Sequence, residues 1–227
     1  MPRNLLDKGI LAVKNEILFL HGMVQRATNA ALDSLMRKDF CASKNIFKND
    51  FLINDKRIEI EYTCLKLIAT QQPIANDLRF LASTLEVITD LERMGDYAKG
   101  IAKINLLIGK EPFLNPIEHL PEMKDLTLSM LERGVEAFIK TDRDMARKIP
   151  REDQFVDDLY ELINKETTNL ILEDGAHFNQ ANHILWAAHN LERMADRVSN
   201  ICIRTNFVVT GKIEELDSEA GLPNLIN

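Results

Sequence analysis

A chain of 227 residues, of which 45% are hydrophobic, can bury a core and form one long domain or two smaller ones. Glycine and proline are scarce, with nine and seven residues, and aromatic residues make up only 6%, which favours helices over strands. The net charge of −7, without a basic block interleaved with aromatics, argues against nucleic-acid binding.

The cysteines and the first residues indicate where the protein works. Cys41, Cys64 and Cys202 are odd in number and form no CxxC pair, which suggests a reducing compartment. No apolar leader follows Met1, and no uninterrupted apolar stretch approaches about 18 residues. We therefore expect a cytoplasmic protein that is at most peripheral to a membrane.

The first half of the chain has the pattern of three long helices. The first is predicted over residues 4–38, where apolar side chains recur at alternating steps of four and three positions. The members of this seam are Leu6, Ile10, Val13, Ile17, Leu20, Val24, Ala27 and Ala31. A second helix, capped by Ser43, is expected to end at Pro73, since the residue before a proline disfavours helical backbone. A third spans residues 74–108.

The second half repeats this plan. Residues 110–116, with two prolines, are expected to link the halves. A helical seam then ends near Thr141, and two further helices are predicted over residues 152–173 and 179–209. Residues 212–227 show little periodicity and are expected to form a loose tail.

One short phrase occurs twice, 100 positions apart: Leu-Glu-Arg-Met followed by an aspartate, within residues 91–96 and 191–196. Two aspartates eleven positions apart also occur in each half, namely Asp39 with Asp50 and Asp142 with Asp153. The repeat predicts an all-α fold of two tandem three-helix bundles, with six long helices related by an internal duplication. The two bundles are expected to cover residues 1–109 and 117–211.

Each phrase places a glutamate and an aspartate four positions apart, hence on one helix face and about one turn apart. The preceding helix of each half carries a second polar pair at the same spacing. The candidate metal ligands are Asp50, Asn54, Glu92 and Asp96 in the first half and Asp153, Asp157, Glu192 and Asp196 in the second. Like charges at this spacing repel by a few tenths of a kcal/mol, so a basic side chain or a metal is expected nearby.

Two interpretations of these acids stay open. In the first, the acids form a solvated surface neutralised by nearby cations, namely Arg93, Lys99 and Lys103 or Arg193, Arg197 and Arg204. In the second, facing carboxylates on neighbouring helices bind hard cations. No Cys/His cluster has zinc spacing, and no Glu-x-x-His motif of the ferritin-like di-iron type occurs.

Motifs of catalysis are missing from the sequence. There is no glycine-rich phosphate loop, Gly-x-Ser-x-Gly elbow or Cys/His nucleophile pair. His189 lies three positions before Glu192, and a surface role is the simpler interpretation of it. We therefore do not expect an enzyme.

Three segments together resemble the PhoU family: Gln-Pro-Ile-Ala-Asn-Asp-Leu-Arg at 72–79, Asp-Leu-Glu-Arg-Met-Gly-Asp at 90–96 and Asn-Leu-Glu-Arg-Met-Ala-Asp at 190–196. The resemblance implies a negative regulator of phosphate uptake and phosphate-starvation signalling. Such a protein would be a cytoplasmic adaptor between a phosphate ABC transporter and a sensor histidine kinase at the membrane face. It also implies metal ions held by the candidate ligands, as multinuclear iron clusters or as manganese, magnesium or zinc.

One departure concerns the first site, where Asn54 stands at the position of Asp157 in the second half. An amide oxygen carries less charge, so the two sites need not be equivalent. The alternatives are a metal-free helical scaffold and a carboxylate-metal hydrolase, in which clustered metals activate water. A homodimer also stays open.

Overall fold

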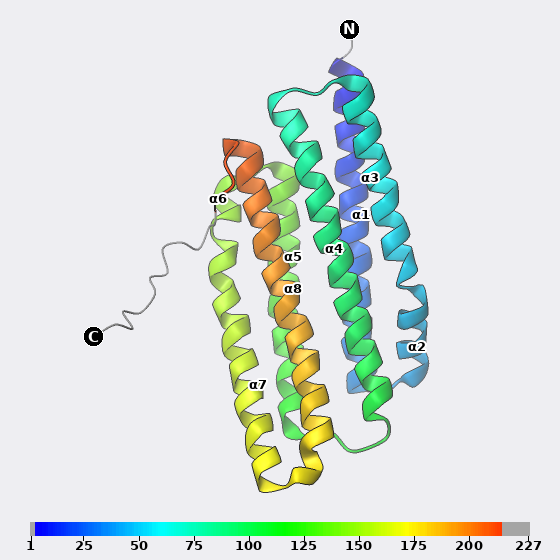
Figure 1. Cartoon of the computed structure of the whole chain (residues 1–227), viewed down its shortest axis with the longest axis vertical. Coiled ribbons are helices and arrows are strands. Elements are labelled where there is room, and N and C mark those ends of the chain that lie inside the picture. The colour runs from blue at the N-terminus through cyan, green and yellow to red at the C-terminus, as the bar shows by residue number, and fades with distance from the viewer. Residues whose placement is uncertain (1–2, 215–227) are drawn as a thin grey trace, which may run out of the picture.

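The structure is a computed structural model, and it describes residues 3–214 as a bundle of long helices that run alternately up and down (Figure 1). The first half contains α1 (Arg3–Met36), α2 (Phe40–Asn49), α3 (Phe51–Gln71) and α4 (Ala75–Ile108). The second half contains the long helices α5 (Leu120–Lys140), α7 (Asp153–Glu173) and α8 (Phe178–Thr210). Four short helical turns connect these elements: η1 (Asn115–His119), α6 (Arg143–Ala146), η2 (Ile149–Glu152) and η3 (Gly175–His177). The predicted tail lies mostly outside the described residues, from position 215 on.

The apolar seam predicted for the first helix faces the core. Val13, Ile17, Leu20, Val24 and Ala31 are fully buried on α1. Each fully buried valine, leucine or isoleucine contributes about 1.5–3 kcal/mol relative to an exposed one. The seam therefore fixes which face of α1 packs inward.

The prediction of a single second helix capped by Ser43 is wrong. The helix begins earlier, because the Asp39 carboxylate accepts a hydrogen bond of 2.9 Å from the backbone N–H of Ala42 and caps α2 at Phe40. Ser43 is instead buried, with its Oγ 2.9 Å from Ser34 Oγ. The hydrogen-bonding pattern is then interrupted at Asp50, so α2 and α3 are separate helices.

Helix ends elsewhere follow the local sequence. Helices α4 and α8 end before Gly109 and Gly211, whose φ angles of 68° and 73° suit a residue without Cβ. Helix α5 ends at Lys140, close to the predicted end near Thr141, and Thr141 itself takes the left-handed conformation as the C-cap.

The two halves pack side by side into one core. The most extensive helix pairing is that of α4 with α8, which belong to different halves, and α1 also contacts α5. The rings of Phe80 on α4 and Phe138 on α5 stack with their centroids 5.1 Å apart. The buried apolar residues of both halves form one continuous cluster.

The structure also bears on membrane contact and on cysteine chemistry. Between residues 3 and 214, no helix is long and apolar enough to cross a membrane. Of the three cysteines, Cys41 is exposed, whereas Cys64 and Cys202 are buried.

Candidate functional site

The first group of predicted ligands lies where the start of α3 meets the middle of α4, two helices in contact. We call Asp50, Asn54, Glu92 and Asp96 the N-terminal acidic surface. Burial raises the pKa of Glu92, and the nearby carboxylates of Asp96 and Asp50 raise it further. The three acids are therefore close enough to interact, and within α4 the pair of Glu92 and Asp96 lies one turn apart.

A lysine lies between these acids. The ammonium of Lys99 donates a hydrogen bond of 2.7 Å to Asp50 Oδ2 across the two helices, and lies 3.6 Å from Asp96 Oδ1 on its own helix. The ammonium also lies over the face of the Phe47 ring, 5.3 Å from the ring centroid. The hydrogen bond to Asp50 raises the pKa of Lys99, so the side chain is charged at neutral pH.

A second cation acts on the same surface from α3. The positive charge of Arg57 lowers the pKa of Glu92, against the larger effect of burial. Arg57 also forms an ion pair of 2.6 Å with Glu61 one turn further along α3. The sequence interpretation did not include Arg57, although its position three residues after Asn54 places it on the same face of the helix.

The second group of predicted ligands occupies the equivalent position on α7 and α8. We call Asp153, Asp157, Glu192 and Asp196 the C-terminal acidic surface. Burial raises the pKa of Asp157, and Asp196 raises it further across the two helices. Burial likewise raises the pKa of Glu192, again with Asp196 as the strongest charged neighbour that adds to it.

The basic residues that lie closest to Glu192 and Asp196 are on the same helix, α8. Arg193 lies 2.8 Å from Asp196 Oδ2, as anticipated for one of the neutralising cations. His189 Nδ1 lies 3.1 Å from Glu192 Oε2, but the two atoms are not aligned for a hydrogen bond. This contact is therefore an ion pair only when the imidazole is protonated.

Arg197 and Arg204 have different partners from those expected. Arg197 reaches across to α4, where its guanidinium lies 3.4 Å from Asp90 Oδ1, and Arg204 lies 3.8 Å from Glu86. Burial raises the pKa of Asp90 to about 6, while Arg197 lowers it. This buried pair joins the two halves and was not anticipated, because it depends on how α4 and α8 pack.

The donor chemistry of both acidic surfaces fits hard cations, since carboxylate and amide oxygens are the ligands that such ions prefer. Within residues 3–214, however, no three His, Cys, Asp or Glu side chains converge closely enough to hold a metal ion. Metal binding therefore requires side-chain rotation, and at the N-terminal acidic surface it also requires Lys99 to move.

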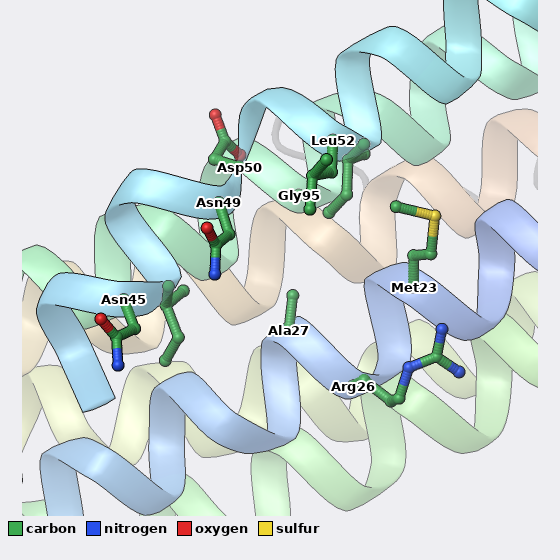
Figure 2. A pocket seen from close by; sticks show the side chains of 10 residues that line it. Met23, Arg26, Ala27, Asn45, Asn49, Asp50, Leu52 and Gly95 are labelled. Atoms are coloured by element: carbon green, nitrogen blue, oxygen red, sulfur yellow. The ribbon is translucent and has the colours of Figure 1, made fainter.

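A pocket of about 380 Å³ lies beside the N-terminal acidic surface, lined by residues of α1, α2, α3 and α4. Figure 2 shows Asn45, Asn49 and Asp50 on one side of it and Met23 and Arg26 of α1 on the other. The sequence interpretation missed this pocket, because its lining residues come from four helices and meet only when these helices pack.

The fold and these surfaces define a class of protein: an all-helical bundle of two repeats, each with an acidic surface on neighbouring helices. The sequence profile of the PhoU domain matches residues 17–104 and 120–205, one match in each half. The chain belongs to the PhoU family of phosphate-specific transport system accessory proteins. The predicted family resemblance and the all-α fold of two repeats are thereby confirmed.

Similar proteins cover nearly the whole chain. The PhoU homolog of Clostridium acetobutylicum is 32% identical over 218 residues, which are 96% of this chain and 100% of that protein. The phosphate transport system regulatory protein PhoU from Streptococcus pneumoniae has a crystal structure with a TM-score of 0.86, at 32% identity. That likeness covers 92% of this chain and 99% of the other. PhoU from Pseudomonas aeruginosa, 26% identical, gives a TM-score of 0.85 over 91% of this chain and 99% of its own.

The family is one of accessory and regulatory proteins rather than enzymes. The carboxylate-metal hydrolase considered from the sequence is therefore set aside.

Proposed function

We propose that this protein is a metal-binding negative regulator of phosphate uptake and of phosphate-starvation signalling. It acts as a cytoplasmic adaptor between a phosphate ABC transporter and a sensor histidine kinase at the membrane face. The names of its relatives, phosphate-specific transport system accessory protein and phosphate transport system regulatory protein, support the regulatory part.

The observation that carries the metal-binding part is the duplication of an oxygen-rich surface. In both halves a glutamate and an aspartate one turn apart on a long helix lie beside an acid of the neighbouring helix. Surface acids arise by chance on one helix, but the same arrangement in two repeats favours a shared role. Iron, with manganese, magnesium or zinc as alternatives, would be held by the eight candidate ligands.

A bound cation would supply positive charge at a place where the chain itself is acidic. The acidic surface would then attract an anion or an acidic segment of a partner. The carboxylates of the two helices would hold the ion, and the long helices would keep both surfaces at a constant separation. Regulation would follow from which partner the charged surface accepts.

A metal-free scaffold is the second candidate, and the ion pairs of Lys99 with Asp50 and of Arg193 with Asp196 favour it. In that case the remaining acids dock basic segments of a partner directly. The two candidates differ in the metal content of the purified protein.

The test compares wild type with a variant that carries Glu92→Ala, Asp96→Ala, Glu192→Ala and Asp196→Ala. Elemental mass spectrometry on protein purified without chelators is expected to find bound iron or another hard metal in wild type and a loss of most of it in the variant. In a strain lacking its own PhoU protein, wild type is expected to restore repression of a phosphate-responsive reporter, and the variant is not.

The matched control removes four exposed acids from α1 and α5 instead, at Asp7, Asp33, Glu122 and Asp125. It changes the net charge equally and is expected to keep metal and repression. A wild type without metal that still represses the reporter would favour the scaffold. Failure of wild type to repress at all would contradict the regulatory proposal.

A further inference from the structure

We propose that the seam between α4 and α8 is a docking surface for an acidic segment of a partner protein that also carries an apolar side chain. This central seam is formed by six residues, namely Arg93, Tyr97, Lys103 and Leu107 of α4 and Trp186 and Arg193 of α8. The inference rests on the adaptor function proposed above. It assigns partner recognition to a surface that contains none of the eight candidate metal ligands.

The central seam follows the most extensive helix contact between the two halves. Helices α4 and α8 run side by side in opposite directions (Figure 1). They approach closely at Gly100, where an added Cβ would lie 3.2 Å from the side-chain amide of Asn190. One turn before Gly100, Tyr97 raises the pKa of Arg193 as its hydrogen-bond partner across the two helices. Residues of both halves therefore contribute to one continuous surface.

Two large apolar side chains are exposed at one end of the central seam. Trp186 is 52% exposed and Leu107 is 50% exposed. Together with Lys103 they line a pocket of about 290 Å³ between the helices. Single exposed apolar residues are common on protein surfaces, but these two come from different helices and share one pocket. Tryptophan is also among the residues that contribute most to binding at protein interfaces. This end of the seam therefore suits an apolar side chain of a partner.

The charges of the central seam indicate what surrounds that apolar side chain. The chain as a whole has a net charge of −7, yet the charged residues of the seam, Arg93, Lys103 and Arg193, are all basic. Arg193 pairs with Asp196, whereas neither Arg93 nor Lys103 forms an ion pair within residues 3–214. Two positive charges are thus available to a ligand, and carboxylates complement them.

The spacing along α8 sets the arrangement of the partner. Trp186 and Arg193 are seven positions apart, which is two turns or about 10 Å along the helix. A segment with an apolar side chain in the pocket would therefore carry its acidic side chains within about 10 Å of it. A protein segment is favoured over a nucleic acid, because the two acidic surfaces lie on either side of α4 and α8 and would repel a long polyanion.

The test uses the full chain and a synthetic peptide in which one phenylalanine and one leucine are surrounded by glutamates. Trp186 is the one tryptophan of the chain, so its fluorescence reports binding at the central seam. The peptide is expected to shift the emission to shorter wavelength, because it covers an exposed indole. Peptides with lysine in place of glutamate, or with alanine in place of phenylalanine and leucine, are expected to bind at least about tenfold more weakly.

Variants of the apolar end are compared by the fluorescence anisotropy of the same peptide carrying a dye. Trp186→Ala with Leu107→Ala is expected to weaken binding about tenfold or more, since it removes the walls of the pocket. Circular dichroism checks that the variant is folded, as expected for changes at two exposed side chains.

Variants of the basic residues test the charges separately. Arg93→Gln with Lys103→Gln is expected to weaken binding about tenfold and to reduce its dependence on salt. The matched control is Lys66→Gln with Lys165→Gln, which removes two exposed lysines from α3 and α7 and changes the net charge equally. It is expected to bind the peptide as wild type does.

The outcomes separate this inference from the proposed function. Trp186→Ala with Leu107→Ala is expected to keep the metal content of wild type and to lose repression of the phosphate-responsive reporter. Full repression by this variant would overturn the docking surface and leave the proposed regulator in place. Failure of wild type itself to repress would contradict the proposed function, whereas the peptide titrations would still decide between an acidic ligand and none.

Other occupants of the central seam are also outcomes of the test. A single-stranded oligonucleotide that shifts the Trp186 emission at lower concentration than the acidic peptide would overturn the proposal in favour of nucleic acid. A wild-type dimer that Trp186→Ala dissociates, seen by analytical ultracentrifugation, would assign the seam to a second copy of the chain instead. Equal binding of the glutamate and lysine peptides would show that charge does not select the partner, and would overturn the proposal too.

Discussion

At the scale of single residues, Asp90 is a buried acid on the boundary between the two halves. Its carboxylate pairs with Arg197 of α8, and its pKa is raised to about 6 by burial. In the unfolded chain an aspartate titrates near ~3.9. Between these two values the folded protein binds more protons than the unfolded one, so the contribution of Asp90 to stability falls as pH rises from about 4 to 6.

The substitution Asp90→Asn removes this titration. We expect the free energy of unfolding of the variant, relative to wild type, to rise by about 1–3 kcal/mol between pH 4 and pH 7, because asparagine stays neutral where aspartate must ionise. Urea unfolding at pH 4, 5, 6 and 7 measures this difference.

The matched control for Asp90→Asn is Glu86→Gln, which changes a more exposed acid at the same interface, 3.8 Å from Arg204. It tests whether removing any carboxylate from this interface produces the same change. A relative stability of Asp90→Asn that falls with pH would show that the ion pair with Arg197 outweighs the cost of burial.

The acidic surfaces show how much of the candidate site can be predicted from the sequence alone. Spacing placed Glu92 beside Asp96 and Glu192 beside Asp196, since residues four apart share a helix face. The partners of the long basic side chains could not be predicted from the sequence in the same way. Lys99 was one of several candidate cations, and only the packing of α3 on α4 selects Asp50 as its main partner.

At the scale of elements, the start of α2 depends on one capping interaction. Asp39 precedes the helix with extended backbone, and its carboxylate accepts the N–H of Ala42. Ser43 had the right chemistry for a cap but lies in the first turn of the helix. There it joins a buried group in which Asn105 Nδ2 donates hydrogen bonds to Ser43 Oγ at 2.8 Å and to the backbone oxygen of Ser34 at 2.9 Å.

The change Asp39→Ala is expected to lower the free energy of unfolding by about 1 kcal/mol, since the backbone N–H group of Ala42 loses its acceptor. Chemical denaturation measures the loss. Asp39→Asn is the control and should cost only a few tenths of a kcal/mol, because asparagine caps helices as well as aspartate. Equal losses for both variants would point to the charge of Asp39 rather than its hydrogen bond.

At the scale of the whole molecule, the two repeats share one core. Helices α4 and α8 pair across the halves, and buried residues of both form one cluster. A unit of this kind is expected to unfold in one transition, because neither half can lose its structure without exposing apolar surface of the other.

Trp186, the one tryptophan of the chain, lies on α8 in the second half and provides a local probe. The change Ile17→Ala on α1 in the first half is expected to lower the free energy of unfolding by about 2–5 kcal/mol, since Ile17 is fully buried. Tryptophan fluorescence and far-UV circular dichroism should report the same shifted midpoint. A fluorescence transition that stays at the wild-type midpoint would show that the halves unfold independently.

The sequence by itself determined the helical content, the repeat and most helix ends, because these depend on apolar periodicity and on local backbone chemistry at residues such as Gly109 and Gly211. It also determined the acids of each surface, through spacing within a helix. Tertiary structure alone decided that α4 packs on α8, that Arg197 reaches Asp90, and that Lys99 bridges two helices. These contacts join residues far apart in the chain, and the partner of a long side chain depends on which helices pack against each other.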